Sequence, residues 1–118
     1  MPTELRKVIL TAEETLRAIQ SYARMVPRFL PRGEVHGFHL DEAAEDGVGL
    51  MVSAEAENGD TTVLIQVEPK PAEVIEILVR CCLENNIPIP RLGTKRAVLV
   101  EGMLALSIRY ESHLPYEA

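Results

Sequence analysis

Two histidines and an aspartate in the segment 34–42, EVHGFHLDE, form the densest local set of metal-ligand types in the chain. Side chains alternate between the two faces of an extended strand, so we expect His39 and Asp41 on one face and His36 on the other. A mononuclear metal site normally needs three converging protein ligands, and the sequence points to no third one. We therefore interpret the segment as a strand with solvent-facing histidines. Metal-dependent hydrolysis through His36, His39 and Asp41 is the weakest of three function hypotheses.

Basic residues are the second candidate set, as contacts for an anion or a partner. Arg91, Lys95 and Arg96 belong to the proline-braced segment 87–96, IPIPRLGTKR, and Arg28 and Arg32 follow the first predicted helix. Gly93-Thr94-Lys95 lacks the glycine spacing of a phosphate loop. A cationic end of the molecule requires that the first helix and this segment converge, and would use these residues: Arg17, Arg24, Arg28, Arg32, Arg91, Lys95 and Arg96.

A nucleic-acid-associated protein using this basic face is the alternative hypothesis. It is disfavoured by the net charge of −6 and by an aromatic content of only 4%. Nucleic-acid binding relies on a positive field, and single strands are usually held by stacking on aromatic side chains.

The nucleophile types offer no catalytic arrangement. Cys81 and Cys82 are adjacent, near the end of a predicted helix and within an apolar run, where the helix dipole disfavours a thiolate. We interpret them as small core hydrophobes in a reducing cytoplasm. No Gly-x-Ser-x-Gly motif occurs, and the acids Glu42, Glu45 and Asp46 lie in a predicted solvated turn. We predict no catalytic residue, no metal ligand and no cofactor.

Charge is distributed unevenly along the chain. No Lys or Arg occurs between Arg32 and Lys70, whereas nine acids do, and basic segments flank this stretch on both sides. The 118 residues, of which 47% are hydrophobic, suit a single domain spanning residues 1–118. No segment approaches the roughly 20 apolar residues of a membrane span, so a membrane partner is not expected.

Two helices and several strands are predicted around these residues. Thr11 and Glu14 have the spacing of a capping box at the start of a helix, and Pro27 ends that helix near Met25. The second helix begins at Pro71, where proline is favoured at the first position. Its apolar residues cover about 240° of the helical wheel, more than the roughly 100° that one packing surface needs.

The strands are predicted at 35–40, 48–56, 61–68 and 96–110. Asn58-Gly59 predicts a type I′ hairpin, and counting outward from it pairs Ala54 with Val63 and Val52 with Ile65. Residues 97–108 form either one long strand or a second hairpin about Glu101-Gly102. We favour the hairpin, which leaves both of its faces apolar.

These elements predict an α+β fold: a two-layer sandwich of one antiparallel sheet with four to six strands and two helices on one face. Surplus apolar surface on the second helix and on the 97–108 edge predicts a homodimer. The leading hypothesis is a non-catalytic cytoplasmic interaction or regulatory module that uses opposed charge to bind another protein.

Overall fold

The computed structural model describes residues 2–29, 33–43 and 47–111. It confirms the α+β class. The elements follow in this order: β1 (Thr3–Ile9), α1 (Ala12–Met25), β2 (Gly33–Ala43), β3 (Gly47–Asn58), β4 (Thr61–Val67), α2 (Pro71–Glu84), β5 (Thr94–Val100) and β6 (Met103–Glu111). Within the described ranges, neither helix is long and apolar enough to cross a membrane.

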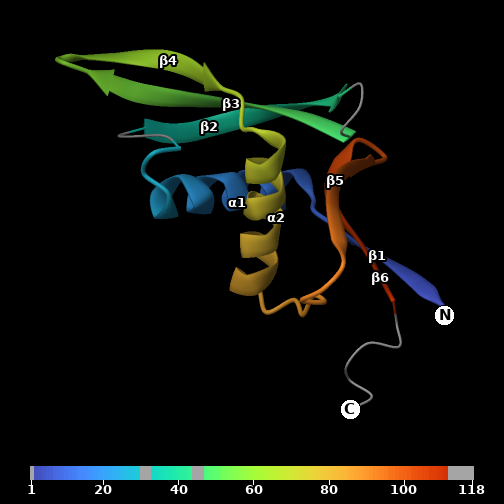
Figure 1. The fold of residues 1–118 in the computed structure, drawn as a ribbon. Coiled ribbons are helices and arrows are strands. Elements are labelled where there is room, and N and C mark those ends of the chain that lie inside the picture. The colour runs from blue at the N-terminus through green and yellow to red at the C-terminus, as the bar shows by residue number, and fades with distance from the viewer. Residues whose placement is uncertain (1, 30–32, 44–46, 112–118) are drawn as a thin grey trace.

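The strands form two antiparallel three-stranded sheets, in place of the single four- to six-stranded sheet that the sequence predicted. Sheet A has the order β1-β6-β5 and sheet B the order β2-β3-β4. The split arises because β1 pairs with β6 at the other end of the chain, and not with β2. Each helix contacts strands of both sheets, so the helices lie in the angle between the sheets and do not cover one face of a single layer (Figure 1).

Both predicted hairpins are present, and the first has a register different from the prediction. Asn58 pairs with Thr61, so the loop residues are Gly59 and Asp60, and Ala54 pairs with Ile65. Gly59 has a φ of 67°, as the first central residue of a type II′ turn requires. The resulting shift of two residues leaves every side chain on its expected face, because the side-chain period of a strand is two.

The second hairpin turns at Glu101 and Gly102, as favoured from the sequence. Their φ values of 51° and 80° are both positive, as a type I′ turn requires, and Val100 pairs with Met103. The hairpin places Leu104 and Leu106 on the inner face of sheet A, where both are fully buried.

Strand β2 contains a β-bulge that the sequence did not reveal. Val35 pairs with Ala54 and Gly37 with the adjacent Ser53, so His36 is an extra residue in the strand. The bulge keeps Phe38 on the same side of the sheet as Val35, because Phe38 pairs with the fully buried Val52. It therefore changes which residues share the outer face.

The helix ends follow the predicted signals. In α1 the backbone N–H of Glu14 donates to Thr11 Oγ1 at 3.2 Å, and the N–H of Thr11 donates to Glu14 Oε1 at 2.8 Å. Helix α2 has Pro71 in its first turn and ends before Asn86, whose φ of 56° is left-handed. The capping box satisfies backbone N–H groups at the start of α1. At the end of α2 the carbonyls of Cys81 and Cys82 accept from the backbone N–H groups of Asn85 and Ile87.

One apolar core joins both sheets and both helices. Tyr22 and Phe29 contribute its aromatic pair, with ring centroids 5.0 Å apart. The largest fully buried aliphatic side chains come from four elements, α1, β3, α2 and β6: Ile19, Leu50, Ile77, Leu78, Leu104, Leu106 and Ile108. The radius of gyration is 16.0 Å, whereas a globular chain of this length has one of about 13.5 Å. The excess reflects an elongated shape, in which the β3–β4 hairpin on one side and the outer ends of β1 and β6 on the other project beyond the helices (Figure 1).

Candidate functional site

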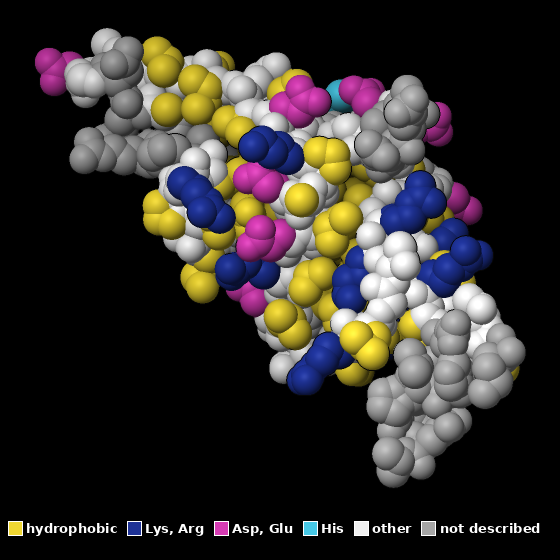
Figure 2. All heavy atoms as spheres, viewed as in Figure 1, with side chains coloured by type: hydrophobic (Ala, Val, Ile, Leu, Met, Phe, Trp, Pro, Cys, Tyr) yellow, Lys and Arg dark blue, Asp and Glu magenta, His cyan; other side chains and the backbone are white. Residues whose placement is uncertain are grey.

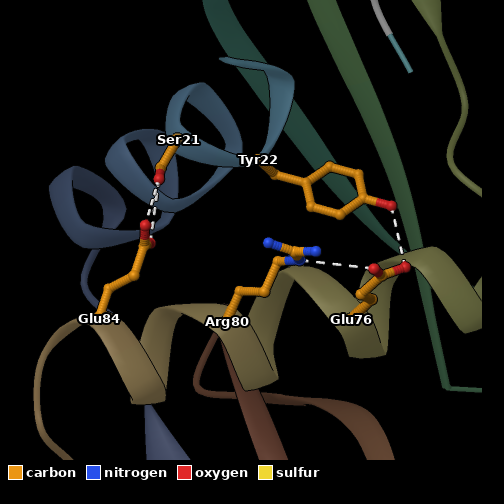
Figure 3. Close-up of polar contacts among 5 residues, drawn as sticks. All are labelled: Ser21, Tyr22, Glu76, Arg80 and Glu84. Carbon is orange, nitrogen blue, oxygen red and sulfur yellow. Dashed lines mark hydrogen bonds and ion pairs between the residues drawn. The ribbon is translucent and has the colours of Figure 1, made fainter. Parts of the chain in front are cut away.

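Helices α1 and α2 are joined by polar contacts (Figure 3). The Tyr22 hydroxyl of α1 donates to Glu76 Oε2 of α2 at 3.1 Å. Within α2, Arg80 Nε donates to Glu76 Oε1 at 3.4 Å. The Arg80 guanidinium also lies 5.9 Å from the centroid of the Tyr22 ring. Near the C-terminal end of α2, the Glu84 carboxylate accepts from Ser21 Oγ of α1, with distances of 2.7 and 3.0 Å to its two oxygens. Glu76, Arg80 and Glu84, which form the polar stripe of α2, therefore face α1.

Tyr22 is the buried member of this set. Its side chain is only 2% exposed. Burial raises the pKa of the Tyr22 hydroxyl, and the hydrogen bond to Glu76 raises it further. The contact therefore holds Tyr22 as a neutral donor, which suits a role in fixing the angle between the helices.

A third stripe of α2, distinct from its buried and polar stripes, is apolar. It is open to solvent at Leu83, whereas Ile75 and Val79 also pack against the core. Leu83 is 63% exposed, and Ile75 and Val79 are partly buried. The three residues are spaced by four, which makes them one ridge of the kind that packs into the groove of another helix. Figure 2 shows hydrophobic side chains along the middle of this face, where α2 runs. We call Ile75, Val79 and Leu83 the α2 ridge.

A groove lies between the end of β1, helix α1 and the C-terminal end of α2. Its floor is apolar, with Leu10, Ala18 and Cys81 among its lining residues, and Arg17 and Arg24 also line it. Burial raises the pKa of the Cys81 thiol, and the Glu14 and Glu84 carboxylates add to the effect against an opposing hydrogen bond. A nucleophilic thiol needs the reverse shift.

Cys82 lies on the core side of the same helix. Both cysteines are free thiols, and Cys82 is 0% exposed. Burial raises the pKa of the Cys82 thiol, and the neighbouring Cys81 raises it further. The side chains therefore pack as hydrophobes, as the sequence indicated.

The two sheets carry opposite charge. The strands of sheet B contain five acids and no Lys or Arg, whereas those of sheet A contain five basic and two acidic residues. The net charges are therefore −5 and +3. In Figure 2, Lys and Arg side chains gather beside β5, and Asp and Glu side chains lie along sheet B. The charge pattern in the sequence thus becomes a polarity between two parts of the molecule.

The predicted basic residues do not gather on one face. Arg28 follows α1 at one end of the helix pair, whereas Arg91, Lys95 and Arg96 lie in β5 and the segment before it, at the far side of α2 (Figure 1). Lys95 Nζ donates to the Arg91 carbonyl at 3.4 Å. Lys95 and Arg96 are consecutive in a strand, so their side chains leave opposite faces. Arg32 lies outside the described residues, as do Glu45 and Asp46.

The histidines lie differently from the prediction. His39 and Asp41 do share a face, with Nε2 and Oδ1 3.0 Å apart. The prediction that His36 lies on the face opposite to His39 and Asp41 is wrong. The bulge places it on the outer face too, where its Nε2 lies 3.3 Å from Oε2 of Glu55. His36 thus meets Glu55 and Glu34. Alternation alone places Glu34 and His36 on one face, whereas the contact with Glu55 depends on the pairing register of β2 with β3.

Comparisons of the chain with protein-family models, curated proteins and solved structures found no match.

Proposed function

We propose that this protein is a non-catalytic interaction or regulatory module that acts as a homodimer in the cytoplasm, with the α2 ridge at the centre of the interface. The observation that carries the proposal is the outward ridge itself. Leu83 is 63% exposed although it belongs to a helix whose opposite side is fully buried. Removing apolar surface from water is worth about 25 cal/mol per Å², so an exposed ridge favours association.

The spacing of the ridge supports a second copy as its occupant. Ile75 and Leu83 each lie four residues from Val79. A two-fold axis passing near Val79 between two antiparallel α2 helices therefore places Ile75 of each copy opposite Leu83 of the other. Such an interface is isologous, because the same residues contribute from both sides. The polar stripe that faces α1 stays outside it.

The charges of the two sheets indicate which kind of partner the dimer binds. Sheet B is uniformly acidic and sheet A is predominantly basic, and dimerisation along α2 leaves sheet B exposed in both copies. Electrostatic complementarity selects partners and accelerates encounter more than it adds affinity. We therefore propose that a protein with a basic surface is recognised by sheet B.

A matched pair of substitutions tests the dimer. Leu83→Glu places a charge in the α2 ridge, and Leu64→Glu makes the same change on β4 at a leucine that is 78% exposed. In a two-fold interface the first change acts twice and buries two carboxylates, which is costly without a partner charge. We expect Leu83→Glu to raise the dimer dissociation constant at least tenfold in sedimentation equilibrium, and Leu64→Glu to leave it within twofold. Equal effects of the two variants would contradict the proposed interface.

A further inference from the structure

Two carboxylates and one imidazole converge on the outer face of sheet B. Ligand atoms of Glu34, His36 and Glu55 all lie within 4.8 Å of one another. In a tetrahedral zinc site with ligand bonds of about 2.0–2.2 Å, neighbouring ligand atoms are about 3.3–3.5 Å apart. The 3.3 Å between His36 Nε2 and Glu55 Oε2 already has this separation. The Glu34 carboxylate is exposed and can complete the set by side-chain rotation.

The backbone builds this arrangement in two steps. Glu34 and Glu55 are direct cross-strand partners, and His36, two residues after Glu34, lies on the same outer face at the β-bulge. Two like charges directly opposite each other destabilise a sheet unless something compensates them. The chain has no Lys or Arg between Arg32 and Lys70, so the strands of sheet B supply no permanent cation to this pair. A bound cation would relieve the repulsion.

We propose that Glu34, His36 and Glu55 form a binding site for a divalent transition metal ion, with Zn²⁺ as the best-fitting ion. One imidazole and two carboxylates suit zinc and its neighbours, whereas Ca²⁺ takes six to eight oxygen ligands and Mg²⁺ prefers an octahedral oxygen shell. Three protein ligands leave one tetrahedral position for water. The space beside the adjacent Gly37 is open, because a side-chain carbon built there would meet no atom within 4 Å.

The test uses ZnCl₂ alone, titrated calorimetrically into metal-free protein. We expect one Zn²⁺ per chain and a loss of affinity of at least tenfold in both His36→Ala and Glu55→Gln. His39→Ala is the matched control, because His39 has the same kind of carboxylate neighbour on the same face, and among the described residues it belongs to no group of three converging ligands. This control should bind Zn²⁺ within twofold of the unchanged protein. All three side chains are at least partly exposed, and circular dichroism verifies that each variant is folded.

A cobalt spectrum separates this site from binding at the thiols. Co²⁺ held by Glu34, His36 and Glu55 shows no thiolate-to-metal charge-transfer band, whereas Co²⁺ held by Cys81 or Cys82 shows one. The proposal is overturned by the absence of Zn²⁺ binding, by a thiolate band that accounts for the bound metal, or by affinity that is lost equally in His36→Ala and His39→Ala.

Discussion

Removing the Tyr22 hydroxyl isolates the contact that orients α2 against α1. A hydrogen bond to a charged group contributes about 1.5–3 kcal/mol to stability. The Glu76 side chain is 43% exposed and keeps Arg80 as a partner, so water can replace part of what is lost. We therefore expect Tyr22→Phe to lower the free energy of unfolding by about 1.5 kcal/mol, at the low end of that range.

The assay is urea unfolding at fixed protein concentration, supported by the melting temperature. The entropy of unfolding is about 2.1 cal/mol/K per residue, so for 118 residues the loss corresponds to about 6 °C. Tyr110→Phe is the matched control, since it removes a hydroxyl that donates to Glu4 at 2.9 Å on an exposed surface. We expect about 0.5 kcal/mol or less from this control. Equal losses in the two variants would refute the role assigned to Tyr22.

The same contact predicts a dependence on alkaline pH. The pKa of Tyr22 is raised above its usual 10.0 by burial first and by the hydrogen bond to Glu76 second. A group whose pKa is raised in the folded state contributes its full stabilisation of the fold below its unfolded-state pKa. It loses that contribution as pH rises through its folded-state pKa. The stability difference between the unchanged protein and Tyr22→Phe should therefore be constant up to about pH 10 and shrink above it. A difference that grows above pH 10 would contradict this.

Three other outcomes are expected from the local geometry. Thr11→Ala should lower the free energy of unfolding by about 1 kcal/mol by removing the α1 cap, and Thr11→Ser should retain it. The hydrogen bonds to Thr11 lower the pKa of Glu14, so the Glu14 carboxylate stabilises the fold above pH 4.5 and this stabilisation is lost as pH falls through the lowered pKa. Urea unfolding of Glu14→Gln at a series of acidic pH values should lack this part of the pH dependence. Gly47→Ala should lower the melting temperature more than Gly59→Ala does. Both glycines have a positive φ, but only at Gly47 does an added side-chain carbon meet the Ala97 carbonyl.

Local signals in the sequence predicted the elements well. The capping box at Thr11, Pro71 at the start of α2 and the turn at Glu101-Gly102 are each determined by a few neighbouring residues. The apolar surplus on α2 was also visible, since it depends only on helical periodicity. The structure sharpens this prediction by turning the polar stripe toward α1 and leaving the α2 ridge outward.

Features that depend on distant pairing were not predicted. The division into two sheets requires β1 to find β6 across nearly the whole chain, and no local pattern encodes that choice. The bulge at His36 breaks the alternation on which the expected faces were based, so His36 shares a face with His39 and Asp41. The meeting of His36 with Glu55 depends on the pairing register of β2 with β3, which no local pattern encodes. Whether the first helix and the segment 87–96 converge was left open by the sequence, because it depends on how distant elements pack. In the structure the segment after α1 and the segment before β5 lie apart (Figure 1).

Dimerisation is the central claim, and sedimentation equilibrium of the unchanged protein at micromolar concentration tests it most directly. The α2 ridge predicts a species of twice the 13.1 kDa chain mass, which shifts toward the single chain in Leu83→Glu. A single 13.1 kDa species throughout the micromolar range would contradict the claim.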